Sequence, residues 1–184
     1  MARLIALAGA VLIGAALAPA AAADEAPPLD PLDANVIFLP TPPAVVDGMF
    51  DLAGVRAGDV LYDLGAGDGR IPIAAAQRFG IRAVGIEINP RMVEIARANV
   101  RRAGVERLVE IRQGDALEAD LREASVVTLF LFRELNLELR PRLQAQLRPG
   151  ARVVSHRFDM GDWMPDAQTT VHGNPLYRWT IREP

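Results

Sequence analysis

The sequence predicts an α/β fold built around a largely parallel sheet. Short apolar segments alternate with segments of helical periodicity between residues 60 and 155. A glycine-rich turn joins the first such strand to the first such helix, and acidic residues stand at the carboxyl ends of three of the strands. This alternation is typical of right-handed βαβ units, which bind ligands at the carboxyl ends of their strands.

The most informative stretch is VLYDLGAGDGR, from Val60 to Arg70. Its apolar start indicates a buried strand, and the residues after the turn, Ile71 to Phe79, have a helical pattern that Gly80 ends. Glycines in the turn allow positive φ and let a ligand approach the backbone without a Cβ in the way. They are Gly65, Gly67 and Gly69.

The chemistry of this turn indicates a cationic ligand. A dinucleotide-binding turn has glycines in the order G-x-G-x-x-G, whereas here the third glycine comes one residue early and Arg70 takes the place of the final glycine. The carboxylates of Asp63 and Asp68 would repel a pyrophosphate. They suit a ligand with positive charge and no phosphate. S-adenosylmethionine (SAM), with its sulfonium and α-ammonium groups, is such a ligand.

A second strand is predicted at Arg82–Glu87. Glu87 ends this strand about two dozen residues after Asp63, where it can accept hydrogen bonds from both hydroxyls of a ribose. Asn89 and Pro90 then begin a helix as its N-cap and first helical residue, and Gly104 ends it.

The remaining segments continue the alternation. A continuous apolar run from Ser125 to Phe132 is expected to be a central parallel strand buried on both faces. The tail around Gly173-Asn174-Pro175 indicates a hairpin, which would add an antiparallel pair of strands to the sheet. The other predicted elements are a strand at Leu108–Gln113, a helix at Leu135–Leu147 and a strand at Ala151–Ser155.

In kind and order, the glycine turn and the acids at the strand ends resemble the motifs of class I SAM-dependent methyltransferases. The resemblance implies a Rossmann-like α/β fold, a seven-stranded mixed sheet with helices on both faces, and SAM as the cofactor. It also implies that Asp115 meets the adenine amino group and that the backbone of Ala116 meets the ring. Thr41 would lie in a lid near the methionine end, with a rigid turn as the alternative. The predicted cofactor-binding residues are Thr41, Asp63, Gly65, Gly67, Asp68, Gly69, Glu87, Asp115 and Ala116.

Further blocks narrow the resemblance. The segments LPTP (39–42) and LYDLGAGDGRI (61–71) are similar to those of small archaeal and bacterial methyltransferases, and of mitochondrial enzymes that methylate lysine in a component of ATP synthase. The block SHRFDMGDWMP (155–165) resembles a bacterial subset with the same kind of leader peptide. The resemblance spans residues 36 to 166 and implies an amine acceptor, with a protein lysine as the best choice.

No catalytic residue is assigned from the sequence. Glu134 and Asn136, after the predicted fourth strand, and His156, after the fifth, are candidates for contact with the acceptor. Their structural alternatives are a helix cap, a backbone hydrogen bond and a hydrogen-bonded structural histidine. Trp163 is a candidate for the acceptor entrance, with core packing as the alternative. Residues 130–134, FLFRE, lack the Pro-Pro-aromatic motif usual in enzymes that methylate the amino groups of nucleic acid bases. Base methylation is therefore disfavoured.

Composition limits the function further. The chain has no cysteine, which excludes disulfides, thiolate metal sites and a cysteine nucleophile. Its formal charge of −3 provides no general attraction to nucleic acid. All 20 basic residues are arginine, a bias that genome composition explains, so the chain has no lysine of its own to methylate. We expect no metal site and a monomer.

The N-terminal part is predicted to be separate from the catalytic domain. Residues 1–23 have the layout of a secretory signal peptide, with an apolar run from Leu4 to Ala18 and small residues before Asp24. An uncleaved membrane anchor is the alternative. Residues 24–35 are expected to form an acidic, Pro-rich linker, and residues 36–184 the methyltransferase domain. Both interpretations predict an enzyme that is exported (periplasmic or secreted) or anchored in the inner membrane. The domain would then lie outside the cytoplasm, in a compartment that does not make SAM.

Alternative functions remain open. A non-catalytic SAM-binding module is consistent with the leader and with the missing motif after the fourth strand. A methyltransferase that acts on a small molecule fits the same cofactor site. A nicotinamide oxidoreductase is disfavoured because Arg70 replaces the third glycine of a dinucleotide-binding turn.

Overall fold

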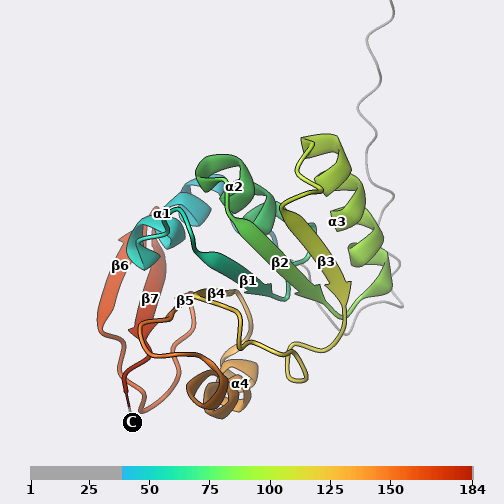
Figure 1. Cartoon of the computed structure of the whole chain (residues 1–184). Helices are drawn as coiled ribbons and strands as arrows, with labels where there is room; N and C mark the ends of the chain where they lie inside the picture. Colours follow the sequence, from blue (N-terminus) through green and yellow to red (C-terminus); the bar gives the residue numbers. More distant parts are fainter. Residues whose placement is uncertain (1–38, 184) are drawn as a thin grey trace, which may run out of the picture.

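Seven strands form one sheet in the order β3-β2-β1-β4-β5-β7-β6 (Figure 1). The structure, a computed structural model, describes residues 39–183. Strands β1 to β5 are parallel, whereas β7 is antiparallel to β5 and to β6, so the predicted seven-stranded mixed sheet is confirmed. The strands are β1 (Val60–Leu64), β2 (Arg82–Glu87), β3 (Val109–Gln113), β4 (Val126–Leu129), β5 (Arg152–His156), β6 (Ala167–Val171) and β7 (Asn174–Thr180).

Helices cover both faces of the sheet, as predicted (Figure 1). Leu61 and Tyr62 on β1 illustrate how the layers form, because successive side chains of a strand point to opposite faces. Leu61 packs in the core beneath α1, α2 and α3, and Tyr62 packs in the core on the α4 side. The helices are α1 (Pro43–Ala53), α2 (Arg70–Phe79), α3 (Pro90–Ala103) and α4 (Arg133–Gln146).

The direction of the chain reverses beside β1. It runs outward from β1 through β2 to β3 and then returns to the other side of β1 as β4. The carboxyl ends of β1 and β4 therefore flank the switch point at which open α/β sheets bind their ligands. The strand register places Asp63 of β1 between Gly85 of β2 and Thr128 of β4.

The ends of α3 are those that the sequence predicts. The side chain of Asn89 accepts hydrogen bonds from the backbone N–H groups of Arg91 at 2.9 Å and Met92 at 3.4 Å. Pro90 occupies the first helical position, where its missing N–H has no partner to lose. Gly104 ends the helix in the left-handed region, with a φ of 67°.

β4 is shorter than predicted. Its paired residues end at Leu129, although the apolar run continues to Phe132. The chain turns away from the sheet after Leu129, and α4 begins at Arg133 instead of Leu135. The apolar character of residues 130–132 thus belongs to a connection that lies at the carboxyl edge of the sheet.

The C-terminal hairpin is confirmed, but its turn is not where the sequence indicates. The turn consists of His172 and Gly173, which both have positive φ, 47° and 78°. A two-residue turn of this kind matches the twist of its flanking strands. Asn174 and Pro175, predicted to lie in the turn, belong to β7.

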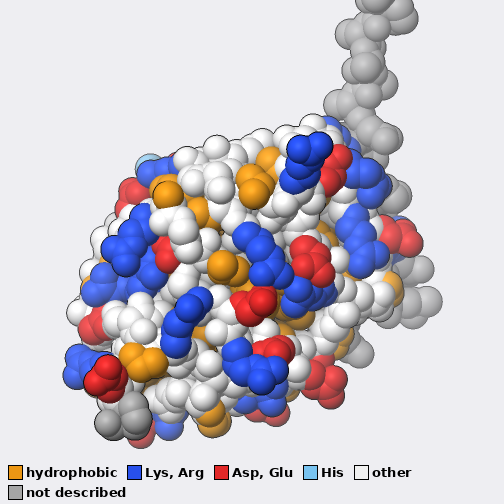
Figure 2. Space-filling view, viewed as in Figure 1, with side chains coloured by type: hydrophobic (Ala, Val, Ile, Leu, Met, Phe, Trp, Pro, Cys, Tyr) orange, Lys and Arg blue, Asp and Glu red, His pale blue; other side chains and the backbone are white. Residues whose placement is uncertain are grey.

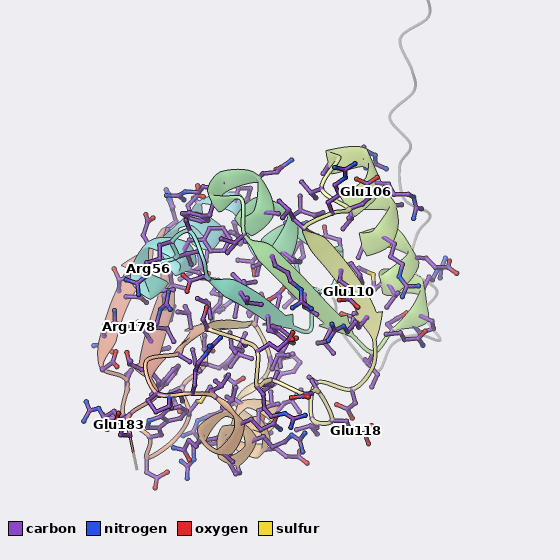
Figure 3. The ribbon with its side chains drawn as sticks, in the orientation of Figure 1. Arg56, Glu106, Glu110, Glu118, Arg178 and Glu183 are labelled. Atoms are coloured by element: carbon purple, nitrogen blue, oxygen red, sulfur yellow. The ribbon has the colours of Figure 1, made fainter. Side chains whose placement is uncertain are left out.

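Arg178 attaches the antiparallel edge of the sheet to α1. Its side chain projects from β7 (Figure 3) and donates hydrogen bonds to Asp166 at 2.8 Å and to the carbonyl of Leu52 in α1 at 3.1 Å. The C-terminal end of α1 is thereby fastened to the antiparallel part of the sheet.

The predicted N-terminal regions lie outside the described residues. These are residues 1–23, the linker 24–35 and the first residues of the predicted domain, 36–38. Within residues 39–183, no helix combines the length and the apolar character that crossing a membrane requires.

Candidate functional site

A cavity of about 310 Å³ opens at the carboxyl edge of the parallel sheet, a volume at the lower end of the range of small-molecule sites. It contains every predicted cofactor-binding residue except Gly69, and none of the three catalytic candidates. The residues that line it are Leu39, Pro40, Thr41, Asp63, Gly65, Ala66, Gly67, Asp68, Arg70, Ile71, Ile86, Glu87, Ile88, Asn89, Met92, Gly114, Asp115, Ala116, Leu117, Phe130, Leu131 and Leu135.

Asp63, at the end of β1, is the most deeply buried acid of the cavity, with 2% of its surface exposed. Its Oδ1 accepts a hydrogen bond from the hydroxyl of Thr128 at 2.7 Å, whereas its Oδ2 has no partner. Burial is the main reason that the pKa of Asp63 rises to about 7; the charges of Glu87 and Asp68 add to the rise, and the Thr128 hydrogen bond opposes it. A buried oxygen without a partner fits a hydrogen-bond donor of a ligand.

Glu87, at the end of β2, joins two parts of the cavity wall. One carboxylate oxygen accepts from the backbone N–H of Gly67 at 2.8 Å, and the other from the backbone N–H of Asn89 at 2.9 Å. The side chain thus connects the glycine turn to the start of α3. Each carboxylate oxygen can accept a second hydrogen bond, so the residue keeps capacity for the hydroxyls of a ligand.

The glycines of the turn have different roles. Gly65 has a φ of 80°, which strains any larger residue, and a Cβ there would lie 2.7 Å from the end of the Leu131 side chain, which would have to shift. Gly69 also has a φ of 80°, but its Cβ would lie 3.2 Å from the Cβ of Ala96 in α3. Gly69 therefore permits α3 to pack close to the start of α2, and its contact with the cofactor stays a prediction.

Arg70 connects the glycine turn to the segment over the cavity. Its guanidinium pairs with Asp68 at 2.6 Å and donates a hydrogen bond to the carbonyl of Thr41 at 3.1 Å. Thr41 is buried and lines the cavity, and its place in a lid near the methionine end of SAM stays a prediction. The planar guanidinium can hold two partners in fixed directions, which explains how one residue positions both sides of the site.

Asp115 and Ala116 follow β3 and form the other end of the cavity. Asp115 is half-buried, and its Oδ1 accepts from the backbone N–H of Leu117 at 2.8 Å. Ala116 is buried beside it. The Asp115 side chain is therefore held in a fixed direction by its own turn, while its second oxygen is available to a ligand.

His156, at the end of β5, is buried but does not line the cavity. Its Nε2 lies 3.2 Å from the side-chain oxygen of Asn174 and its Nδ1 lies 3.4 Å from the hydroxyl of Thr41. Because the amide oxygen only accepts, Nε2 carries the hydrogen and Nδ1 accepts from Thr41. Burial lowers the pKa of His156, with the charge of Arg157 adding to the effect and the Asn174 hydrogen bond opposing it. His156 thus acts on the site through Thr41.

Asn136 and Glu134 lie in the first turn of α4, outside the cavity lining. Asn136 is fully buried and donates hydrogen bonds to the hydroxyl of Ser155 at 3.1 Å and to the carbonyl of Phe158 at 3.3 Å. It therefore fastens α4 to the end of β5. Glu134 is exposed. Catalytic roles for these two residues stay predictions.

Several residues of the site were not identified from the sequence. Thr128, the partner of Asp63, is the only polar residue in the apolar run from 126 to 132, and this exception was the signal that could have identified it. Leu131 and Ile88 line the cavity without any sequence feature that separates them from core residues.

The family follows from comparison with known proteins. A protein-lysine N-methyltransferase from Saccharolobus islandicus is 46% identical to this chain over 154 residues, which cover 81% of this chain and 96% of that protein. The ANTKMT methyltransferase domain family matches residues 63–167, more than half of the chain. The chain belongs to the ANTKMT methyltransferase domain family.

Mammalian proteins are also similar to this member of the family. The mouse adenine nucleotide translocase lysine N-methyltransferase is 39% identical over 138 residues, and a human lysine N-methyltransferase named for an ATP synthase component is 34% identical over 132 residues. These matches cover 74% and 72% of this chain, but only 59% and 56% of the two mammalian proteins.

Solved structures agree with the fold. An RNA methyltransferase from Salinibacter ruber in complex with S-adenosylhomocysteine (SAH) has a TM-score of 0.78 and 57% identity, and covers 79% of this chain and 95% of that one. A SAM-dependent methyltransferase from Thiobacillus denitrificans, also with SAH, has a TM-score of 0.58 at 23% identity, covering 67% of this chain and 52% of that one, and shows the fold alone.

The enzyme is a SAM-dependent methyltransferase, and SAM is its cofactor. The residues of the cavity fit this cofactor on physical grounds. The unpartnered Oδ2 of Asp63 suits a cationic group, and the remaining lone pairs of Glu87 suit hydroxyls. Gly65 and Gly67 line the cavity without a Cβ, so a ligand can approach the backbone of the turn.

The location predicted from the N-terminal segment is wrong. The names of the relatives refer to protein lysine, adenine nucleotide translocase and ATP synthase, and none of these names refers to an exported protein. An exported or inner-membrane-anchored enzyme does not agree with these relatives. The prediction relied on the apolar composition of residues 1–23, which lie outside the described structure.

Proposed function

We propose that this enzyme transfers the methyl group of SAM to the side-chain amine of a lysine in a protein. The names of the Saccharolobus and mammalian relatives support this acceptor. The structural observation that carries the proposal is the apolar end of the cavity, formed after β4 by Phe130, Leu131 and Leu135. A lysine amine must be uncharged to attack a methyl carbon, and apolar surroundings lower the pKa of an ammonium group.

We assign the cofactor contacts as follows. Oδ2 of Asp63 accepts from the α-ammonium group, and the remaining lone pairs of Glu87 accept from the ribose hydroxyls. Asp115 accepts from the adenine amino group, and the backbone of Ala116 lies against the ring. Thr41 closes the methionine end. Asp63, Glu87 and Asp115 come from β1, from β2 and from the segment after β3, three strands that are neighbours in the sheet, and this order supports the assignment.

Bound SAM supplies a methyl carbon that its sulfonium already activates. The protein then contributes alignment of the amine with that carbon and exclusion of water. Phe130, Leu131 and Leu135, which line the cavity after β4, have no titratable side chain. Burial of the amine, with loss of its proton to solvent before attack, is thus the contribution we propose for this wall.

An RNA acceptor is a second candidate, because the Salinibacter structure at 57% identity is named an RNA methyltransferase. The charge of the enzyme favours the protein acceptor. On the face shown in Figure 2, arginine side chains are interleaved with acidic ones. Arg82 pairs with Glu123 and Arg112 with Glu110, both at 2.7 Å, so these cations are neutralised within the protein. The expected monomeric state stays a prediction.

Labelled SAM distinguishes the two acceptors. The full chain is incubated with methyl-labelled SAM and either an RNase-treated protein extract or the purified RNA of the same cells. We expect label in methyllysine after acid hydrolysis of the protein fraction. Because the chain contains no lysine, methylation of its own lysine side chains adds no background. Label confined to RNA would show that RNA, and not a protein lysine, is the acceptor. The Asp63→Ala variant serves as the inactive control.

A further inference from the structure

A row of aromatic rings leads from the cavity to the surface. Phe130, which lines the cavity, lies 6.5 Å from Phe158 between ring centroids, with an angle of 24° between the planes. Phe158 in turn lies 5.8 Å from Phe132, at 59°. Phe132 is 54% exposed. We call Phe130, Phe158 and Phe132 the aromatic wall.

Contacts with β5 and α4 hold the aromatic wall in place. His156 stacks on Phe130, with 3.9 Å between ring centroids, and is itself fixed by Asn174. The backbone of Phe158 is fixed by the hydrogen bond from Asn136 to its carbonyl. Arg157, between His156 and Phe158, has a φ of 73°, a strained conformation for a residue with a side chain. Such strain at the end of a strand is typical of a functional site, where the surrounding contacts maintain it.

Core packing alone does not explain these rings. A large aromatic side chain in a core is expected to be buried, yet Phe132 exposes more than half of its surface. Phe130 belongs to the cavity whose other residues hold the methyl donor. The wall therefore connects solvent to the place where the acceptor amine must arrive.

We propose that the aromatic wall is the acceptor subsite and that it binds the ammonium-bearing end of the acceptor side chain through the faces of its rings. This inference rests on the proposed lysine acceptor and names the residues that would receive it. Ring faces attract ammonium groups, and the apolar ring surface also packs against the aliphatic stem of a lysine.

An aromatic subsite has a chemical advantage over a carboxylate. A carboxylate beside the amine would favour the charged form and raise its pKa, which opposes formation of the nucleophile. Ring faces attract the arriving cation more weakly than a carboxylate and accept no proton, so they oppose deprotonation of the amine less. The carboxylates that line the cavity belong to β1, the glycine turn, the end of β2 and the segment after β3, on the cofactor side. They are Asp63, Asp68, Glu87 and Asp115.

The test compares a cation with its neutral isostere. The full chain is saturated with SAH and titrated with Nα-acetyl-trimethyllysine amide, and in parallel with the analogue in which carbon replaces the quaternary nitrogen. We expect the cationic probe to bind roughly fivefold more tightly, a ratio typical of one cation–π contact. Phe158→Leu should abolish this preference, and Phe158→Tyr should keep it. Equal binding of the two probes to the unmodified enzyme would overturn the proposal.

Controls separate the subsite from the fold and from the proposed function. Phe132→Leu is at an exposed position and should reduce the preference for the cationic probe even where Phe158→Leu affects folding. Unchanged SAH affinity in these variants shows that the cofactor site is intact. Met164→Leu, at a surface residue outside the cavity lining, should leave the preference unchanged. If lysine is labelled but the enzyme shows no preference for the cationic probe, the proposed acceptor subsite is refuted and the proposed lysine acceptor is not. A preference with label confined to RNA would refute the lysine acceptor instead.

Discussion

Asp63 and Glu87 are buried acids of the same cavity, but they differ in what they already bind. Both oxygens of Glu87 accept backbone N–H groups, whereas Asp63 keeps one oxygen without a partner. Glu87 therefore maintains the shape of the site in addition to any ligand contact. Asp63 keeps a buried acceptor oxygen without a hydrogen bond, which lowers the stability of the ligand-free protein and leaves the oxygen for a ligand.

Glu87→Gln should weaken SAM binding by about tenfold or more and lower the free energy of unfolding by about 1–3 kcal/mol, because the new amide N–H₂ opposes a backbone N–H donor. Calorimetry and urea denaturation measure the two effects. The exposed Glu118, in the connection after β3 (Figure 3), provides the control Glu118→Gln, which should change neither quantity. Unchanged affinity in Glu87→Gln would remove Glu87 from the cofactor site.

The raised pKa of Asp63 predicts a pH-dependent affinity. With a pKa of about 7, Asp63 is mostly neutral at pH 6 and mostly charged at pH 8. If the charged form binds the α-ammonium group of SAH, the affinity should rise about tenfold over this interval. Calorimetry at several pH values measures the change. Asp63→Asn should bind more weakly and show a flat profile, and an equally steep profile in that variant would refute the assignment.

The same shift has the opposite effect on the stability of the ligand-free enzyme. The folded pKa of about 7 exceeds the unfolded value of 3.8, so the folded state holds the proton more tightly between these values. The contribution of Asp63 to stability is therefore present below pH 3.8 and is lost as the pH rises to 7 and beyond. Saturation with SAH should offset part of this loss at pH 8.

At the scale of single elements, α2 offers a matched pair of glycines. Gly69 before the helix and Gly80 after it both lie in the left-handed region, with φ of 80° and 64°. A Cβ at Gly80 would meet nothing within 4 Å, whereas at Gly69 it would lie 3.2 Å from that of Ala96. Gly80→Ala should cost about 1–2 kcal/mol of unfolding free energy. Gly69→Ala should lower the free energy of unfolding more than Gly80→Ala and should also weaken SAM binding. Urea denaturation measures both variants, and equal losses of unfolding free energy would contradict the role of the α2–α3 contact.

Most elements could be predicted because their signals are local. The Asn89 cap, the Gly104 stop and the alternating apolar pattern act within a few residues, and the structure has them where expected. The end of β4 could not be predicted, because a buried strand and a cavity wall both require apolar residues. Similarly, the turn signals of Gly173, Asn174 and Pro175 do not indicate that the hairpin turns earlier, at His172 and Gly173.

The candidate site shows the same division. The acids at the strand ends were predicted from their order along the chain, and the cavity brings them together. The pairing of Asp63 with Thr128 depends on the register of β1 and β4, and the bond from Arg70 to the Thr41 carbonyl joins residues 29 positions apart. These contacts depend on tertiary structure, which periodicity and spacing do not specify.

At the scale of the whole molecule, Arg152 connects the elements at the amino end of the sheet, opposite the cavity. It donates to Asp59 at 2.7 Å and to the carbonyls of Ala53 and Gly54 at 3.0 and 3.2 Å, so a single side chain links β5, the entry to β1 and the end of α1. Burial raises the pKa of Asp59, but the hydrogen bonds from Arg152 and Ser125 outweigh it and the net pKa is lowered.

Arg152→Ala should lower the free energy of unfolding by about 3–5 kcal/mol, because it leaves a largely buried carboxylate without its partner. SAM affinity should be unchanged below the unfolding transition. Since the folded pKa of Asp59 is below its unfolded value, the stabilisation is present above the unfolded pKa and is lost as the pH falls through the folded one. Arg122→Ala, which breaks the exposed pair with Asp120, is the control and should lower the free energy of unfolding far less than Arg152→Ala, because solvent screens an exposed pair; similar losses in the two variants would refute the prediction.

With the proposed cofactor contact, the unpartnered oxygen of Asp63 would also couple the catalytic cycle to exchange of a proton with the medium. At pH 7 about half of the ligand-free molecules carry a proton on this carboxyl group. Entry of a cofactor with an α-ammonium group would expel that proton, and departure of the product would allow it to return. The measured heat of cofactor binding should then depend on the buffer that takes up the proton, and should differ between Tris and phosphate at the same pH.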